Sequence, residues 1–301
     1  MTRLSALIVG CGALGKKLAL RLLCDGWVLR ASVRQPAQQQ RLAALGIPAF
    51  VMDLDQAIEV ESSLLQANVI VYLVPPFAGT AVEAQVRITR LCALFSPTAR
   101  PQHIVFVSTT GVYGDCGGVW INEEQQLNPQ APRAFRRVAA EQALVAAAHT
   151  LGFSYCILRV AGIYGPGRLP FARLQQALPV LRRDESPYSN RIHEDDLLEV
   201  GVAAMGHTTS SEIFNVADDE PSSMTEYFFK IADLWQMNRP PEISLPEAQT
   251  QLSAEMLSYL TESRRIDNSK MKEYLGVCLK YPTLDLGLAA CRNVGTTGET
   301  D

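Results

Sequence analysis

The sequence predicts an α/β protein built on a Rossmann-type, doubly wound parallel sheet. Three observations predict this fold: an apolar segment that runs into a glycine-rich turn at the start of the chain, alternating strand-like and helix-like segments through the first half, and two nearly continuous apolar runs at 68–74 and 103–108. Such runs are typical of parallel strands that are buried on both faces. The alternation is typical of strand–helix–strand units joined by right-handed crossovers.

Strand-like and helix-like segments follow one another along the first half of the chain. The first apolar strand and its glycine turn precede an amphipathic helix, and a strand, a helix and a third strand follow. Pro75 and Pro76 end the fourth strand, because proline cannot donate to a sheet. An alanine-rich helix separates the fifth strand from the sixth. The expected strands lie at residues 4–9, 28–33, 47–52, 68–74, 103–108, 153–160 and 213–216, and the expected helices at 13–25, 35–45, 80–94, 136–148, 195–205, 225–235, 268–276 and 283–291.

The regular alternation loosens after Val160, where proline and glycine become frequent. We therefore expect a dinucleotide-binding Rossmann domain over residues 1–161 and 191–217. A small C-terminal substrate lobe, interleaved with it, is expected over residues 162–190 and 218–292. The polar tail at 293–301 is expected to be disordered.

The composition restricts the classes of function. The 301 residues carry a net charge of −4 and are 48% hydrophobic, which is typical of a globular protein with a sizeable core. No run of lysine and arginine indicates a nucleic-acid partner, and no apolar run approaches the ~18 residues of a membrane-spanning helix. The seven cysteines are scattered without a C-x-x-C pair. This spacing favours reduced thiols in a cytoplasmic protein and no metal site.

The first strand leads into the pattern G-x-G-x-x-G at residues 10–15. Gly10 permits a tight turn, Gly12 lets the backbone approach a pyrophosphate, and Gly15 lets the following helix pack closely on the strand. The N–H groups of the first helical turn, which includes Leu14, would bind the phosphates. The pattern alone also fits an ordinary glycine-rich turn. Its place between a strand and a helix favours a dinucleotide-binding site.

Several further stretches occur in an order that is characteristic of one family. They read M-D-L at 52–54, V-S-T-T-G-V-Y-G-D at 107–115, R-V-A-G-I-Y-G-P-G-R at 159–168, I-H-E-D-D-L at 192–197, F-N-V-A at 214–217 and I-D-N-S-K at 266–270. Together with the glycine turn, this ordered set resembles the extended short-chain dehydrogenase/reductases, the NAD-dependent epimerase/dehydratase group. The resemblance covers residues 4–291.

The resemblance implies roles for individual residues. Asp53 with Leu54 would lie against the adenine, and Pro75 would contact the cofactor at the end of the fourth strand. Thr109 occupies the position of the family's catalytic serine or threonine. Further candidates are Tyr164 as a proton donor, and Tyr113, Arg168 and Arg191 as substrate contacts, the arginines for an anionic group. For both tyrosines, a ring packed beneath a loop is the alternative interpretation.

One pair of positions departs from the family's pattern. The family's acid/base pair is Tyr-x-x-x-Lys on the helix after the fifth strand, and counting back from Glu141 places Arg133 and Arg137 at these two positions. A guanidinium group only donates hydrogen bonds and does not deprotonate in a working pH range, so Arg133 cannot take a proton from a substrate. Arg137 keeps a cation that could bind the nicotinamide ribose. The chain therefore resembles the atypical members, which keep the glycine turn and lack the pair.

The end of the second strand bears on the choice of cofactor. NAD-selective members carry an acidic residue there, whereas this chain reads R-A-S-V-R at 30–34 without a carboxylate. Arg34 could bind a 2′-phosphate through charge-assisted hydrogen bonds. We therefore expect NADP(H) to be preferred over NAD(H). A solvated arginine at a strand end is the alternative.

Three functions stay open from the sequence. The first is an NADP(H)-dependent, epimerase/dehydratase-like oxidoreductase that acts on a small molecule. The second is a non-catalytic NADP(H)-binding sensor or scaffold, which the loss of the acid/base pair favours, and plain nucleotide binding is a third. By analogy with the family, the chain would form a homodimer through the helices at 80–94 and 136–148.

Overall fold

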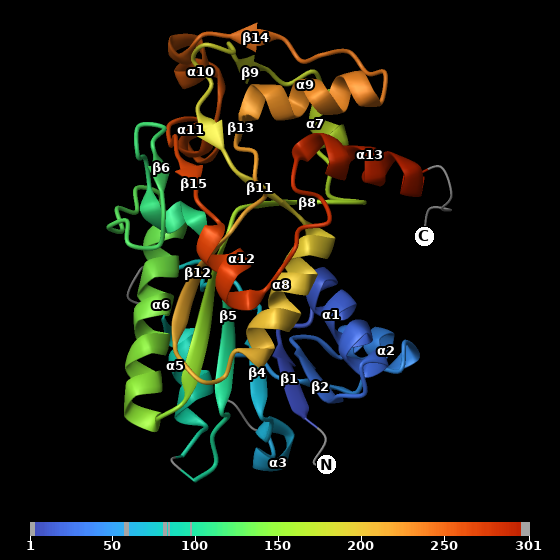
Figure 1. Ribbon diagram of the computed structural model, residues 1–301, viewed down its shortest axis with the longest axis vertical. Coiled ribbons are helices and arrows are strands. Elements are labelled where there is room, and N and C mark those ends of the chain that lie inside the picture. The colour runs from blue at the N-terminus through green and yellow to red at the C-terminus, as the bar shows by residue number, and fades with distance from the viewer. Residues whose placement is uncertain (1–3, 57–59, 81–82, 84, 97, 296–301) are drawn as a thin grey trace. The chain divides into compact units, whose positions relative to one another are not determined.

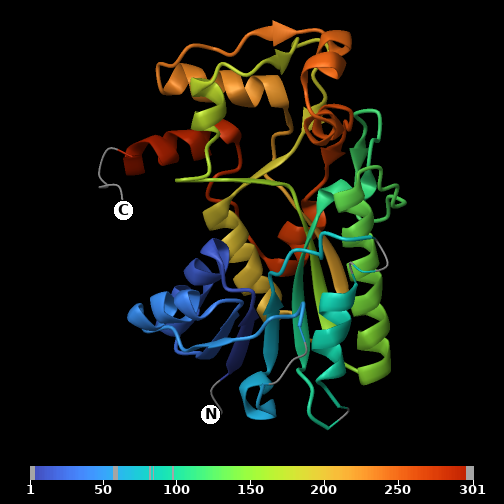
Figure 2. The ribbon, with the colours of Figure 1, turned by 180° about the vertical axis from the view of Figure 1, so that it is seen from behind.

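The computed structural model describes residues 4–56, 60–80, 83, 85–96 and 98–295 (Figures 1 and 2). The chain forms two compact units. Unit 1 consists of the described residues within 1–112, 132–159 and 198–214, and unit 2 of those within 113–131, 160–197 and 215–301. Residues 113–131 and 191–197, which the sequence assigned to the dinucleotide-binding domain, group with unit 2.

Unit 1 is built on a seven-stranded parallel sheet in the order β12-β7-β5-β4-β1-β2-β3. β1 pairs in parallel with β2 and with β4, so that Ala6 lies opposite Leu29 on one side and Val69 on the other. The chain extends from β1 to β3 in one direction and from β4 to β12 in the other, so the strand order reverses between β1 and β4. The strands are β1 (Ser5–Val9), β2 (Val28–Val33), β3 (Ala49–Val51), β4 (Val69–Tyr72), β5 (His103–Thr109), β7 (Ser154–Val160) and β12 (Glu212–Val216).

Helices cover both faces of this sheet (Figures 1 and 2). On one face, alternate strand residues such as Leu7 and Ile104 share a buried cluster with Ile88 of α5 and with residues of α6. On the other face, Ile8 lies beside Gly15 of α1. Successive strand residues point to opposite faces, so one short strand serves two cores. The helices are α1 (Ala13–Cys24), α2 (Pro36–Ala44), α3 (Ser62–Leu65), α5 (Val86–Ala93), α6 (Pro132–Leu151) and α8 (Glu194–Gly206), with a 3₁₀ turn, η1 (Thr110–Tyr113), after β5.

Unit 2 has a hydrophobic core of its own, around α9 and α13. Tyr164, Ile231 and Leu288 are fully buried in it. Ser223 caps α9 by accepting a hydrogen bond from the Glu226 N–H at 3.0 Å. The elements are β6 (Trp120–Ile121), β8 (Gly162–Tyr164), α7 (Phe171–Gln175), β9 (Val180–Leu181), β10 (Tyr188–Ser189), β11 (Arg191–His193), β13 (Ser222–Ser223), α9 (Met224–Leu234), β14 (Glu242–Ile243), α10 (Leu245–Gln251), α11 (Ala254–Leu260), β15 (Arg265–Ile266), α12 (Ser269–Leu275) and α13 (Leu284–Gly295).

The predicted fold class is confirmed, and all seven expected strands belong to the sheet. The helix expected at 80–94 is shorter, since α5 spans Val86–Ala93 and residues 81, 82 and 84 lie outside the described part. The disordered tail expected at 293–301 does not begin at 293, because residues 293–295 complete the last turn of α13. Residues 296–301 lie outside the described part of the chain. The sequence missed the short strands of unit 2, because two or three residues carry no periodicity.

Among the described residues, no helix combines the length and the apolar character that crossing a membrane requires. In the same part of the chain, no cluster of three or more His, Cys, Asp or Glu side chains could hold a metal ion.

Candidate functional site: a dinucleotide cavity in unit 1

A cavity opens in unit 1 at the carboxyl ends of β1, β2, β3 and β4, where the strand order reverses. Four short segments form its walls: the glycine turn after β1, the end of β2, the loop after β3 and the segment after β4. Ligands of open α/β sheets bind at such a reversal. The lining residues are Val9, Gly10, Cys11, Gly12, Ser32, Val33, Arg34, Gln38, Met52, Asp53, Leu54, Asp55, Val74, Pro75 and Arg87.

Glycine stands at the three positions of the turn for different structural reasons. Gly10 has a φ of +85°, and a Cβ there would lie 2.6 Å from Cγ2 of Val74. A Cβ on Gly15 would lie 3.3 Å from Cγ2 of Ile8, so glycine lets α1 pack closely on β1. At Gly12, by contrast, a Cβ would meet no atom within 4 Å. No described contact requires glycine at this position, which fits the close approach of a ligand phosphate.

The N-terminus of α1 supplies an anion site beside the glycine turn. Gly12 is the N-cap residue, and no side chain caps the helix. The Lys16 N–H donates to the Gly12 carbonyl at 2.8 Å, so the N–H groups of the preceding turn have no partner inside the helix. Leu14 is half-buried in this turn. The open space at Gly12 and this uncapped helix end fit the pyrophosphate of a dinucleotide.

The end of β2 brings polar groups and one cation to the cavity. Ser32 is buried; its hydroxyl accepts from the Gly10 N–H at 3.4 Å and its carbonyl accepts from the Cys11 N–H at 2.9 Å. Arg34 and Gln38 are exposed and line the cavity. Within the described residues, the Arg34 guanidinium makes no hydrogen bond or ion pair, and the carboxylate of Asp55 acts on it only through the electrostatic field.

Arg87 of α5 joins two walls of the cavity. Its Nε and Nη2 donate to the two carboxylate oxygens of Asp55 at 2.6 and 2.5 Å, and its Nη1 donates to the Pro75 carbonyl at 2.7 Å. These hydrogen bonds hold the pKa of Asp55 below its usual value. Asp53 accepts from the Asp55 N–H at 2.9 Å, and Leu54 is buried beside it. The structure thus brings together the expected residues Asp53, Leu54 and Pro75, and adds the ion pair that sequence reasoning missed.

Thr109 and Arg137 lie where β5 ends. Thr109 is the last residue of the strand, and its Oγ1 accepts from the Gly111 N–H at 3.2 Å. Arg137 donates to the Val107 carbonyl at 3.0 Å, and its guanidinium lies 5.7 Å from the ring centroid of Phe106. Burial lowers the pKa of Arg137 to about 10, so the side chain stays cationic at neutral pH. Arg137 ties α6 to β5, and α6 itself contains neither tyrosine nor lysine.

A buried ion pair, which the sequence did not reveal, links α6 to two strands. Arg159 of β7 donates to the Glu141 carboxylate of α6 at 2.9 Å, and the Ser108 hydroxyl of β5 donates to the same carboxylate. Glu141 and Arg159 are only 3% and 4% exposed. Charges so far from water are tolerated only when they are paired. The pair therefore fixes α6 against β5 and β7 beside Thr109.

The two tyrosines that the sequence singled out are interior residues of unit 2. Both are 0% exposed. The Tyr113 hydroxyl donates to Oδ1 of Asn215 at 2.7 Å. The Tyr164 ring packs edge-on against His193, and a Cβ on Gly287 would lie 2.0 Å from its hydroxyl. Burial raises the pKa of Tyr164 above its usual range. These placements favour packing over proton donation for both rings.

The two arginines expected to bind substrate also have partners inside unit 2. Arg168 pairs with Glu194 at 3.0 Å. Arg191 is 8% exposed, and its guanidinium lies 4.2 Å from the ring centroid of Tyr227. A side chain that is stacked and enclosed in this way makes a poor contact for an incoming ligand. The structure favours a packing role for Arg191.

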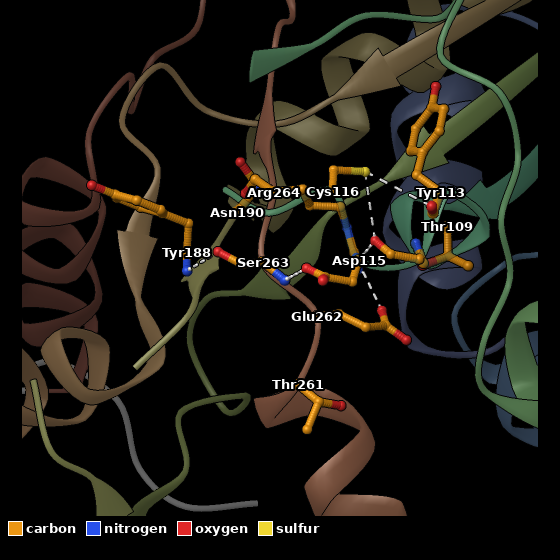
Figure 3. Close-up of polar contacts among 12 residues, drawn as sticks. Thr109, Tyr113, Asp115, Cys116, Tyr188, Asn190, Thr261, Glu262, Ser263 and Arg264 are labelled. Carbon is orange, nitrogen blue, oxygen red and sulfur yellow. Dashed lines mark hydrogen bonds and ion pairs between the residues drawn. The ribbon is translucent and has the colours of Figure 1, made fainter. Parts of the chain in front are cut away.

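The chain that follows η1 is anchored within unit 2 by residues next to β15 (Figure 3). Asp115 accepts from the Ser263 N–H at 2.8 Å, and Arg264 donates to the Gly114 carbonyl at 2.6 Å. Cys116 lies on the same segment, and burial raises the pKa of its thiol. Since the thiolate is the nucleophile, this environment does not favour a reactive cysteine.

A family model described as the NAD dependent epimerase/dehydratase family matches residues 6–217. The match includes the glycine turn and the four strands whose ends line the cavity. The chain belongs to the NAD-dependent epimerase/dehydratase family. This membership confirms the resemblance seen in the sequence and the class of cofactor, a nicotinamide dinucleotide. It does not identify the substrate.

Three known proteins are similar to this chain in sequence or in fold. Protein YeeZ of Escherichia coli K12 is 26% identical over 286 residues, which cover 91% of this chain and 95% of YeeZ. The structure of a functionally unknown conserved protein from Silicibacter pomeroyi has a TM-score of 0.81 at 29% identity and covers 96% of this chain and 98% of its own. UDP-glucuronic acid 4-epimerase from Bacillus cereus, solved in complex with NAD, has a TM-score of 0.75 at 17% identity over 95% of this chain and 97% of its own. The last likeness shows the fold alone.

Proposed function

We propose that the protein binds a nicotinamide dinucleotide in the unit 1 cavity and uses it for oxidoreductase or epimerase-type chemistry on a small molecule. The observation that carries the proposal is Gly12, which no described contact requires to be glycine and which adjoins an uncapped helix N-terminus. A solved relative is a UDP-sugar epimerase with NAD bound, so a sugar nucleotide is the first substrate class to test.

We further propose that NADP(H) is preferred over NAD(H). Arg34 and Gln38 line the cavity where β2 ends, and no carboxylate stands at this strand end. A 2′-phosphate there would receive charge-assisted hydrogen bonds from the guanidinium. The acidic residues of the cavity, Asp53 and Asp55, come from the loop after β3, and Asp55 is already paired with Arg87.

When bound, the nicotinamide ring supplies or accepts a hydride. Thr109 is the proposed catalytic residue, because its hydroxyl stands at the carboxyl end of β5 and can hydrogen-bond a substrate oxygen. Arg137 keeps the start of α6 on β5 through the Val107 carbonyl. Since α6 carries no tyrosine, the proton comes from water or from Thr109. General acid–base assistance is worth about 10²–10⁴-fold, so we expect slow turnover.

The first experiment is a fluorescence titration with NADPH and with NADH. We expect tighter binding of NADPH, and Arg34→Gln should weaken NADPH binding about tenfold while leaving NADH unchanged. Arg30→Gln is the matched control, because Arg30 lies on the same strand but donates to the Ser63 carbonyl at 3.1 Å outside the cavity. Equal affinities for the two cofactors would refute the preference. Binding of neither cofactor would refute the function.

The second candidate, a non-catalytic NADP(H) sensor or scaffold, is favoured by the composition of α6. The double substitution Arg133→Tyr with Arg137→Lys restores the family's pattern on this helix. If this double variant turns over a sugar nucleotide slowly and the unaltered protein does not, the chain descends from an enzyme, and the sensor function is favoured for the present protein. NADPH consumption by the unaltered protein with any carbonyl substrate would exclude the sensor.

We also propose a cytoplasmic homodimer. The proposal rests on the analogy with the family, in which α6 is one of the two pairing helices; Phe135 and Val145 are 47% and 37% exposed on this helix. Phe135→Glu combined with Val145→Glu should convert a dimer to a monomer in light scattering. A monomeric unaltered protein would refute this proposal. The scattered cysteines, none of which forms a disulfide, support the reducing compartment.

A further inference from the structure

The loop after β3 places two carboxylates in a cavity that is proposed to hold a phosphorylated ribose. Asp53 and Asp55 both line the cavity, as does Arg34 at the end of the neighbouring strand β2. An unpaired carboxylate repels a 2′-phosphate and attracts the arginine that would bind it. A preference for NADP(H) is therefore strengthened when another group offsets the charge of one of these carboxylates.

Arg87 is placed to do this. It holds Asp55 through two parallel hydrogen bonds, in the fork geometry that makes arginine–carboxylate pairs strong. The pair is largely enclosed, with 11% of the Arg87 side chain and 21% of the Asp55 side chain exposed. The third donor of Arg87, Nη1, reaches the Pro75 carbonyl, and the Arg87 guanidinium lies 5.4 Å from the ring centroid of Phe77. The side chain is thus held in one orientation.

We infer that Arg87 is a specificity-determining residue of the cofactor site: by occupying Asp55, it keeps Arg34 available for the 2′-phosphate. The inference rests on the proposed NADP(H) preference and adds a residue on α5, which no strand-end pattern reveals. Arg34 lies close enough to Asp55 to lower the pKa of that carboxyl, after the larger effect of Arg87. When Arg87 is removed, Arg34 is the cation that remains in the cavity lining. Arg90 also acts on Asp55, but it donates to the Leu54 carbonyl and does not line the cavity.

The test compares two nucleotide fragments, 2′,5′-ADP and 5′-ADP, by calorimetric titration of the full-length protein. The measured quantity is the ratio of their affinities, which reports the 2′-phosphate and not the general order of the cavity. Arg87→Gln should lower this ratio about tenfold, as expected for one uncompensated charge in a partly open pocket. The double variant Arg87→Gln with Asp55→Asn should return the ratio to its original value.

Two further variants separate charge from structural support. Arg87→Lys keeps the charge without the fork, so the ratio should stay near its original value while both affinities fall together. Arg90→Gln is the matched control, because Arg90 lies one turn along α5 and donates to the Leu54 carbonyl at 2.8 Å rather than to a carboxylate. It should change both affinities by the same factor.

The outcomes are distinct. If Arg87→Gln weakens both fragments equally, or if Asp55→Asn does not restore the ratio, Arg87 is a structural residue only and the inference fails. If the unaltered protein prefers 5′-ADP but Arg87→Gln still lowers the ratio, the inference holds and the proposed NADP(H) preference fails. If the unaltered protein binds neither fragment, both fail. If Arg87→Gln does not fold, the single variant Asp55→Asn tests the inference instead. This variant should raise or maintain the ratio of the affinities for 2′,5′-ADP and 5′-ADP. A lowered ratio refutes the inference.

Discussion

Substituting alanine at two glycines of the same turn should separate folding from cofactor binding. In Gly10→Ala, a left-handed φ of +85° costs about 1–2 kcal/mol. The new Cβ would lie 2.6 Å from Val74 Cγ2, and relieving such overpacking costs about 1–3 kcal/mol. The sum, roughly 2–5 kcal/mol, corresponds to a melting temperature lowered by on the order of 4–20 °C at about 2–4 °C per kcal/mol.

Gly12→Ala should behave differently. The residue has φ −87° and ψ −153°, an extended conformation with a negative φ at the margin of the β region, and a Cβ has no neighbour within 4 Å. We expect the free energy of unfolding to change by less than about 0.5 kcal/mol. The methyl group would nevertheless stand where the pyrophosphate approaches, so NADPH affinity should fall on the order of tenfold or more.

The assay pairs thermal unfolding without ligand with fluorescence titration of NADPH for each variant. If Gly12→Ala lowers the melting temperature as much as Gly10→Ala does, the space around Gly12 is not open in the folded protein. If Gly12→Ala binds NADPH as the unaltered protein does, the proposed role of the turn in cofactor binding is wrong. In that case the ligand phosphate does not approach this turn.

Three further predictions concern the two cores. Glu141→Gln leaves the buried Arg159 charge unpaired and should lower the free energy of unfolding in urea by about 3–5 kcal/mol; a loss below 1 kcal/mol would show that the guanidinium reaches water. Burial raises the pKa of Asp218 to about 8, so the folded state retains this proton while the unfolded chain releases it, and stability should fall as the pH rises from about 4 to about 8. Asp218→Asn should flatten that slope, and an unchanged slope contradicts the assignment. Tyr113→Phe removes the hydrogen bond to Asn215 and should lower the free energy of unfolding by about 1–2 kcal/mol in the same urea assay. A loss of turnover without this loss of stability would instead indicate that Tyr113 contacts the substrate.

The sequence predicted the sheet well because its strands carry a strong local signal. A parallel strand buried on both faces must be apolar throughout, as in the segments that became β4 and β5. The reversal of strand order is typical of the doubly wound sheet that the alternation and the glycine turn together predict. The small elements of unit 2 could not be predicted, because pairs such as β6 with β15 depend on contacts between residues far apart in the chain.

The site shows the same division. Residues at strand ends, such as Gly12, Arg34 and Asp53, could be proposed from the sequence because parallel strands deliver their carboxyl ends to one edge of the sheet, and they line the candidate cavity. Arg87 was missed because its position depends on how α5 packs against that edge. The enclosure of Tyr164 and Arg191 could not be anticipated either, since nothing local distinguishes a loop tyrosine that faces a ligand from one that fills a core.

The division of the chain into two units has a consequence for its synthesis. The polypeptide passes from one unit to the other after residues 112, 131, 159, 197 and 214. Neither unit is therefore a single continuous segment, so a ribosome cannot complete one unit before it begins to synthesise the other. The edge strand β12 ends at Val216, so the nascent sheet keeps β7 as an open edge until this residue has been made. During that interval the unpaired backbone of β7 is exposed to neighbouring chains. A gene shortened at residue 161 to yield the cofactor half alone would make this temporary state permanent, and its product should aggregate.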